Sequence, residues 1–105
     1  MLVAFSVSPS GGDDDGGVSA AVAEAVRVVR ASGLPNETNA MFTNVEGEWD
    51  EVMAVVKQAV DAVASAAPRL SLVLKADIRP GYTGQLTAKV RRIDDVLGEP
   101  QAPTQ

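Results

Sequence analysis

The pattern that most constrains the fold is a strict alternation of side chains from Arg69 to Arg79. Every second residue of this stretch is apolar, and a period of two is typical of a β-strand that turns one face toward a core. The apolar face comprises Leu70, Leu72, Leu74, Ala76 and Ile78, and the other face comprises Ser71, Val73, Lys75, Asp77 and Arg79. A shorter alternation over residues 2–8 predicts a second strand, with Val3, Phe5 and Val7 on its apolar face. The chain must therefore build a sheet with one covered side.

Two longer segments show helical spacing instead. Residues 19–32 carry charged side chains three apart on one stripe, at Glu24, Arg27 and Arg30, which favours a helix that ends at Gly33. Residues 49–67 carry apolar side chains at three- and four-residue spacing, and a proline follows. This second helix has Trp49 on its apolar stripe, so we expect that ring to pack in the core.

The remaining segments complete a recognisable order of elements. Residues 37–46 read as two short strands or one bent strand, whose alternation places Thr43 on the side opposite to Asn44 and Glu46. Residues 86–97 carry a weaker helical pattern. The order is β-α-β-β-α-β with an added C-terminal helix, and its simplest packing is a four-stranded antiparallel sheet with two helices on one face. We therefore expect an α+β, ferredoxin-like sandwich.

Length and composition indicate one domain. The chain has 105 residues, of which 46% are hydrophobic, so we assign residues 1–98 to a single domain and residues 99–105 to a flexible tail. Glycines surround Asp13, Asp14 and Asp15, and such a segment cannot bury apolar surface, so we expect a mobile loop. The segment also lacks the ligand spacing of a calcium loop. Alanine and valine dominate the apolar residues, so each buried position contributes little area and self-association is expected.

Composition also excludes several classes of function. The chain contains neither cysteine nor histidine, which removes thiolate nucleophiles, cysteine-type zinc sites and the commonest general base. A net charge of −5 argues against binding to the phosphates of nucleic acid. No apolar run approaches the length of a membrane span. Much of enzyme chemistry is therefore excluded, and we expect a cytoplasmic protein with no metal or cofactor and with neither nucleic acid nor membrane as a partner. Paired carboxylates such as Glu46 and Asp77 could in principle do acid–base work, but no acid, nucleophile or cofactor site can be identified, so we expect that the protein is not an enzyme.

Four motifs carry a resemblance to a known family. They are FSVSP at residues 5–9, ASGLP at residues 31–35, MFTNVEGEWDEVM at residues 41–53, and KADIR at residues 75–79. In these motifs the chain resembles the small thiamine-binding proteins, which have a ferredoxin-like fold and associate as dimers and tetramers. The resemblance implies binding of thiamine or its hydroxymethylpyrimidine moiety, with no chemical step, by a homo-oligomer.

Polar side chains of the predicted sheet suit such a ligand. An aminopyrimidine offers ring-nitrogen acceptors and an amine donor, so its pocket needs hydroxyl or amide donors and a carboxylate acceptor. The ligand-binding residues that we predict are Ser6, Ser8, Thr43, Asn44, Glu46 and Asp77.

Some of these residues could have a structural role instead of binding a ligand. Glu46 could instead interact with the N-terminus of the helix that follows it, and Lys75, Asp77 and Arg79 could form cross-strand ion pairs. The alternative function is a structural or regulatory interaction module without a small-molecule ligand.

Overall fold

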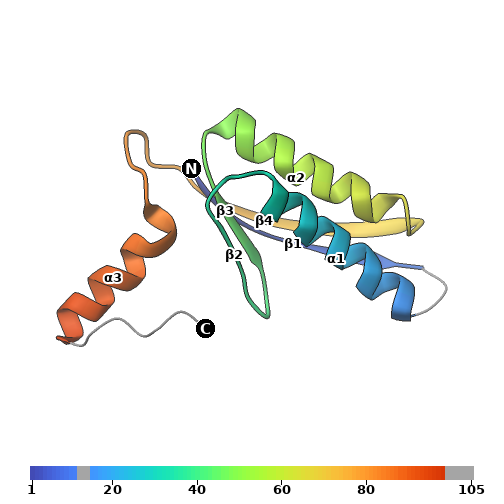
Figure 1. The fold of residues 1–105 in the computed structure, drawn as a ribbon, viewed down its shortest axis with the longest axis horizontal. Coiled ribbons are helices and arrows are strands. Elements are labelled where there is room, and N and C mark those ends of the chain that lie inside the picture. Colours follow the sequence, from blue (N-terminus) through green and yellow to red (C-terminus); the bar gives the residue numbers. More distant parts are fainter. Residues whose placement is uncertain (12–14, 99–105) are drawn as a thin grey trace.

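The computed structural model of the protein describes residues 1–11 and 15–98, and it contains the predicted elements in the predicted order (Figure 1). The elements are β1 (Leu2–Ser10), α1 (Asp15–Ala31), β2 (Asn36–Thr38), β3 (Thr43–Glu46), α2 (Trp49–Ala64), β4 (Arg69–Asp77) and α3 (Gln85–Leu97). The segment that could be one bent strand or two short ones is therefore two strands. The predicted flexible tail, residues 99–105, lies outside the described residues.

The four strands form one antiparallel sheet in the order β2-β3-β1-β4. Both α1 and α2 lie on the same face of this sheet, while α3 stands apart at one end (Figure 1). Strand β1 pairs with β4 along its whole length, from Leu2 opposite Asp77 to Ser10 opposite Arg69, but it pairs with β3 only as far as Phe5. The chain thus adopts the ferredoxin-like α+β sandwich with an additional C-terminal helix.

The core lies between the sheet and the two helices, and it is built from small side chains. Apart from Phe5, its buried apolar members are valines and alanines: Val3, Ala21, Ala25, Val29, Val45, Val52, Val55, Val56, Ala59 and Val63. The prediction that Trp49 packs in this core is wrong, because its side chain is 55% exposed. Trp49 is the first residue of α2. The first residue of a helix can lie beyond the edge of the sheet on which the later apolar residues of the same helix pack.

Several element boundaries differ from the sequence pattern. Strand β1 continues two residues past Ser8 because β4 offers it a partner as far as Ser10. Helix α1 begins at Asp15 rather than at Ser19, which shortens the connection that the glycines and aspartates had suggested. Asp13 and Asp14 lie outside the described residues. Strand β4 ends at Asp77, so Ile78 and Arg79 belong to the loop beyond it.

The junction between β3 and α2 depends on one glycine. A Cβ atom at Gly47 would lie 3.2 Å from a methyl carbon of Val52 and 3.4 Å from Leu34. Glycine is favoured here because the side chains of the core come close to the backbone, which is one of the standard uses of this residue. Helix α2 then begins with a capping box, in which Glu51 accepts a hydrogen bond from the Glu48 backbone N–H at 3.1 Å.

Candidate functional site

A hollow of about 280 Å³ opens between β1, α1 and the turn that joins β2 to β3. Serine, threonine and asparagine residues line it together with aliphatic and aromatic residues. The lining residues are Phe5, Ser6, Val7, Ser8, Val22, Ala25, Val26, Thr38, Asn39, Ala40, Met41, Phe42 and Thr43. This volume lies just below the ~300–1,000 Å³ of ordinary small-molecule sites, which suits a single substituted ring. We call this hollow the β1 pocket.

The pairing of the strands explains why the β1 pocket exists. Strand β3 begins at Thr43, opposite Phe5, so the part of β1 beyond Phe5 has no strand beside it on that side. Backbone N–H and C=O groups on such an edge need hydrogen-bond partners. The β2–β3 turn closes over this gap and is held by Asn39, whose side-chain oxygen accepts hydrogen bonds from the backbone N–H groups of Met41 and Phe42, both at 2.8 Å. The pocket therefore combines an unpaired strand edge with a fixed polar turn.

The structure brings three of the predicted ligand-binding residues together in this pocket. They are Ser6, Ser8 and Thr43. Thr43 lies opposite Phe5 on the side of the helices, as the alternation predicts, and it is 9% exposed. Asn44 lies on the opposite face of the sheet, where it pairs with Ala4, and it does not line the β1 pocket.

Thr38 and Asn39 are pocket residues that sequence reasoning missed. The polar run Asn-Glu-Thr-Asn at residues 36–39 was the available signal. It indicated a turn, but it could not show that the turn folds back over β1.

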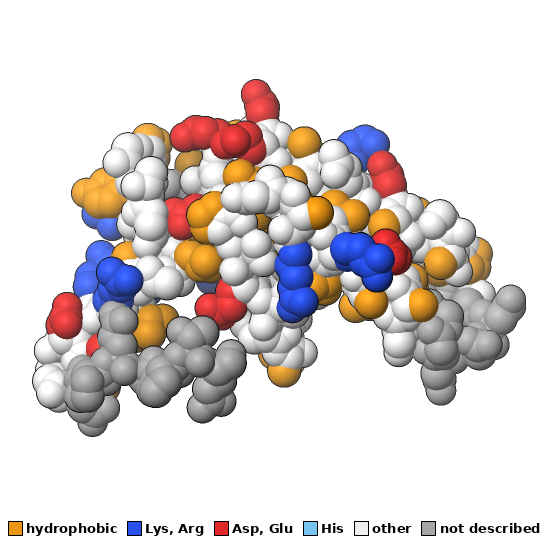
Figure 2. Space-filling model, in the orientation of Figure 1, with side chains coloured by type: hydrophobic (Ala, Val, Ile, Leu, Met, Phe, Trp, Pro, Cys, Tyr) orange, Lys and Arg blue, Asp and Glu red, His pale blue; other side chains and the backbone are white. Residues whose placement is uncertain are grey.

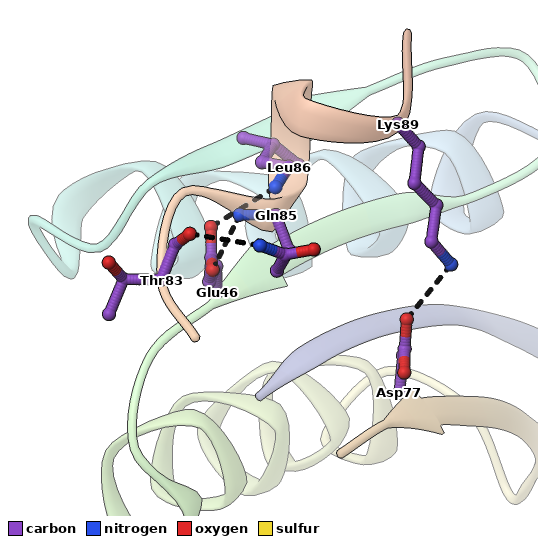
Figure 3. Close-up of polar contacts among 6 residues, drawn as sticks. All are labelled: Glu46, Asp77, Thr83, Gln85, Leu86 and Lys89. Atoms are coloured by element: carbon purple, nitrogen blue, oxygen red, sulfur yellow. Dashed lines mark hydrogen bonds and ion pairs between the residues drawn. The ribbon is translucent and has the colours of Figure 1, made fainter. Parts of the chain in front are cut away.

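The two predicted carboxylates, Glu46 and Asp77, lie in one row at the other end of the sheet. Both pair with Leu2, one from β3 and the other from β4, so they are about two strand spacings, or ~10 Å, apart. Helix α3 joins them, as Figure 3 shows. The buried Glu46 carboxylate accepts hydrogen bonds from the backbone N–H groups of Gln85 at 2.9 Å and Leu86 at 3.1 Å, and Asp77 forms an ion pair with Lys89 at 2.9 Å.

Glu46 therefore caps a helix, but not the one that directly follows it. Its partners are the first two residues of α3, nearly forty positions along the chain. Gly84 precedes them with a φ of 68° and offers no side-chain cap, so Glu46 supplies the acceptor that the N-terminus of α3 needs.

Asp77 is held in its charged form by the same helix. The hydrogen bond and the positive charge from Lys89 lower the pKa of the Asp77 carboxyl from its usual 3.8. Both predicted acids are thus engaged in docking α3. Arg79, which we had considered for a cross-strand ion pair, lies over the ring of Tyr82, with its guanidinium carbon 3.6 Å from the ring centroid.

A second hollow, of about 340 Å³, lies beside Glu46. Its walls come from the start of α2, the segment before β2 and the loop that leads into α3. It is lined by Met1, Leu34, Pro35, Glu46, Gly47, Glu48, Glu51, Tyr82, Thr83, Gly84, Leu86 and Thr87. Figure 2 shows acidic side chains gathered over the nearby start of α2, where Asp50 and Glu51 occupy the first turn. The acids of this second hollow already serve as helix caps, so the β1 pocket is the better ligand site.

Two further features bear on chemistry. Within residues 1–11 and 15–98, no three acidic side chains converge as ligands for a metal ion. None of the described helices is both long and apolar enough to cross a bilayer.

The fold and the pocket define a small ferredoxin-like domain with one mixed polar and apolar hollow against its sheet. The sequence model of the family described as thiamine-binding protein matches residues 3–94. The chain belongs to this family.

Relatives support the assignment. A UPF0045 protein of Mycobacterium bovis is 56% identical over 102 residues, which cover 96% of this chain and 98% of the relative. A UPF0045 protein of Methanocaldococcus jannaschii is 33% identical over 75% of this chain and 79% of its own length.

Solved structures share the architecture. A domain of unknown function from Bacillus cereus matches with a TM-score of 0.79 and 33% identity over 90% of both chains. A Thermotoga maritima protein matches with a TM-score of 0.75 and 27% identity over 88% of this chain and 96% of that one, and its description assigns it provisionally to thiamine biosynthesis or salvage.

Proposed function

We propose that this protein binds thiamine or its hydroxymethylpyrimidine moiety in the β1 pocket, in the cytoplasm, without catalysing a reaction. The observation that carries the proposal is the gathering of Ser6, Ser8 and Thr43 around one ring-sized hollow in a chain that belongs to the thiamine-binding family. The provisional role of the Thermotoga maritima structure in thiamine biosynthesis or salvage points the same way.

The chemistry of the pocket supports an aminopyrimidine. Such a ring presents an amine donor beside a ring-nitrogen acceptor, and a strand edge presents C=O and N–H groups in a matching alternation. The free edge of β1 beyond Phe5 offers these groups, and the hydroxyl of Thr43 can add a further donor or acceptor. Phe5, Phe42 and Val22 would contact the faces of the ring. Because the pocket volume suits one ring, the rest of thiamine would extend into solvent.

Calorimetric titration with thiamine, hydroxymethylpyrimidine and thiamine pyrophosphate tests this proposal. We expect heat with thiamine and with hydroxymethylpyrimidine, because both carry the ring that the pocket would hold. Absence of heat with all three ligands would refute the proposal and leave the interaction module as the better reading.

A pair of variants locates the site. Val22 lines the β1 pocket and is 37% exposed on α1, so Val22→Trp can fill the hollow while leaving the core in place. We expect this substitution to weaken binding by at least about tenfold, the cost of losing ~1.4 kcal/mol of contact. The matched control is Ala54→Trp, at an exposed position of α2 that does not line the pocket, which should leave the affinity unchanged. Equal affinities of the two variants would place the ligand elsewhere.

The second candidate function, an oligomeric interaction module, is favoured by one observation. Large apolar side chains are exposed on α3, namely Val90, Ile93, Val96 and Leu97, and unpartnered apolar surface of this kind is typical of association sites. We propose that the protein is a homo-oligomer, a dimer or a tetramer, whether or not it binds a ligand.

A further inference from the structure

Asn39 closes the turn between β2 and β3 with both its side chain and its backbone. The side-chain oxygen Oδ1 accepts hydrogen bonds from the backbone N–H groups of Met41 and Phe42, both at 2.8 Å. The backbone N–H of Asn39 donates to the Phe42 carbonyl at 2.9 Å. An amide oxygen offers two lone pairs, so the two N–H groups occupy the acceptor capacity of Oδ1. The Asn39 side chain is therefore held in place before any ligand arrives.

The same contacts determine which way the Asn39 amide is turned. With the amide flipped, its NH2 group would meet two N–H donors, which cannot accept a hydrogen bond from it. The Nδ2 group is therefore left out of the turn, and within residues 1–11 and 15–98 no group accepts a hydrogen bond from it. Asn39 lines the β1 pocket. It thus offers the pocket a fixed donor and no acceptor.

The aminopyrimidine that we propose as the ligand needs such a donor. Its ring carries two nitrogen acceptors, one beside the amine and one across the ring from the amine. The free edge of β1 beyond Phe5 can pair with the amine and the neighbouring nitrogen. In that orientation the second nitrogen faces away from β1. The turn between β2 and β3 forms another wall of the pocket, and Asn39 is part of that wall.

The geometry points to Asn39 as the residue that recognises this second ring nitrogen, through a hydrogen bond donated by Nδ2. The inference rests on the proposed function and adds a rule of specificity to it: the site selects rings that carry an acceptor at this position. Because the turn already holds the Asn39 side chain, ligand binding does not have to order it, and less of the contact is lost to entropy.

Asn39 differs in this respect from the other polar side chains of the pocket. Those side chains are hydroxyls, belonging to Ser6, Ser8, Thr38 and Thr43. A hydroxyl can rotate to donate or to accept a hydrogen bond, so it tolerates either kind of ring atom. Asn39 cannot adapt, because its acceptor is occupied by the turn. A ring with an N–H or C–H group at this position would leave the Nδ2 donor without a partner, which costs affinity.

A comparison of two ligands tests whether the second nitrogen is recognised. The probes are hydroxymethylpyrimidine and its deaza analogue, in which a C–H group replaces the ring nitrogen that lies across from the amine. Calorimetric titrations are run at a pH where both rings are uncharged. We expect the wild-type chain to bind the analogue about three- to tenfold more weakly, the usual worth of one hydrogen bond between neutral groups. Equal affinities would overturn the inference.

Asn39→Asp tests which residue supplies the donor. A carboxylate oxygen can still accept from the N–H groups of Met41 and Phe42, but the variant has no NH2 group. We expect Asn39→Asp to bind hydroxymethylpyrimidine no more tightly than the deaza analogue. Asn39→Ala removes the donor without adding a charge and should lose the preference as well. A preference of the wild-type size in either variant would assign the second nitrogen to another residue and overturn the inference.

The ratio of the two affinities separates recognition from damage to the turn. A displaced turn weakens both ligands alike, whereas loss of the donor weakens only the ligand that carries the second nitrogen. Amide hydrogen exchange at Met41 and Phe42 should stay slow in Asn39→Asp and become faster in Asn39→Ala, because only the aspartate keeps the acceptor.

Gln58→Glu is the matched control for the change from an amide to an acid. Gln58 is exposed on α2 and does not line the pocket, so this variant should keep the wild-type preference for hydroxymethylpyrimidine. Loss of the preference in Gln58→Glu would attribute the effect to net charge and overturn the inference. If the wild-type chain binds neither compound, the proposed function fails and the role of Asn39 fails with it. If the wild-type chain binds both compounds without a preference, only the role of Asn39 fails.

Discussion

Glu46 shows that a residue of a family motif can have a structural role. It stands in the segment MFTNVEGEWDEVM, which carries most of the family resemblance, and it is buried at 6% exposure. Both of its oxygens accept hydrogen bonds from the first two residues of α3. A ligand amine would have to displace one of these bonds. The contacts therefore favour a role in positioning α3, while ligand contact by Glu46 stays a prediction.

Glu46→Gln separates these two roles. Glutamine keeps one carbonyl acceptor but loses the negative charge that favours a helix N-terminus, so we expect the docking of α3 to weaken by ~0.3–1 kcal/mol. Hydrogen exchange at the Gln85 and Leu86 amides should become faster, while thiamine affinity stays unchanged. A loss of ~10- to 150-fold in affinity with unchanged amide protection would instead identify a charge-assisted ligand contact.

At the scale of elements, long periodic segments were predictable because their side-chain spacing follows directly from backbone geometry. The alternation of β4 and the spacing of α2 are of this kind. Element ends were less predictable because they depend on partners: β1 extends to Ser10 since β4 pairs with it there. The placement of α3 was not predictable at all. Its docking depends on Glu46 and Asp77, residues from two strands that meet the helix only in the folded chain.

The ion pair between Asp77 and Lys89 should make the docking of α3 sensitive to acid. Lys89 lowers the pKa of the Asp77 carboxyl below 3.8 in the folded chain. The pair therefore stabilises the folded chain fully at pH values above the ordinary pKa of an aspartate carboxyl. This contribution is lost as the pH falls through the lowered pKa that Asp77 has in the folded chain. We expect amide exchange in the second turn of α3, once corrected for its intrinsic pH dependence, to accelerate below about pH 4.

Lys89→Met checks the cause of this dependence. It should return the Asp77 pKa toward 3.8 in a carboxyl NMR titration and should loosen α3 already at neutral pH. Lys57→Met breaks a comparable exposed ion pair with Asp61 on α2 and should leave both Asp77 and α3 unaffected. An unchanged Asp77 titration in Lys89→Met would show that another group lowers this pKa.

At the scale of the whole molecule, the site was only partly predictable. Strand alternation placed Thr43 on the helix side and Asn44 on the other face, as the structure confirms. It could not show that β3 begins at Thr43 and thereby leaves β1 beyond Phe5 without a neighbour. The β1 pocket is a consequence of that missing pairing. A hollow of this kind depends on where one strand stops pairing with its neighbour. The alternation of side chains along the sequence shows which face each residue lies on, but it does not show which residues of two strands pair.

The position of α3 also determines the overall shape. The Cα radius of gyration is 15.4 Å, against about 13 Å for a compact domain of this length. Helix α3 stands outside the two-layer body and contains no buried residue. The free energy of unfolding must therefore come from the sandwich of β1, β3, β4, α1 and α2, whose core is mainly valine and alanine.

Substituting the aromatic residues one at a time tests this account of stability. Phe5 is 2% exposed and is the only aromatic side chain among the buried apolar residues of the described chain. Phe5→Ala should lower the free energy of unfolding by ~3–5 kcal/mol, a large part of the ~5–15 kcal/mol of an ordinary domain. The matched control is Trp49→Ala, which removes a larger ring that is 55% exposed and should cost less than ~1 kcal/mol. Urea unfolding followed by circular dichroism measures both. If Trp49→Ala cost as much as Phe5→Ala, the indole would have to be buried in solution, and the position of Trp49 outside the core would be wrong.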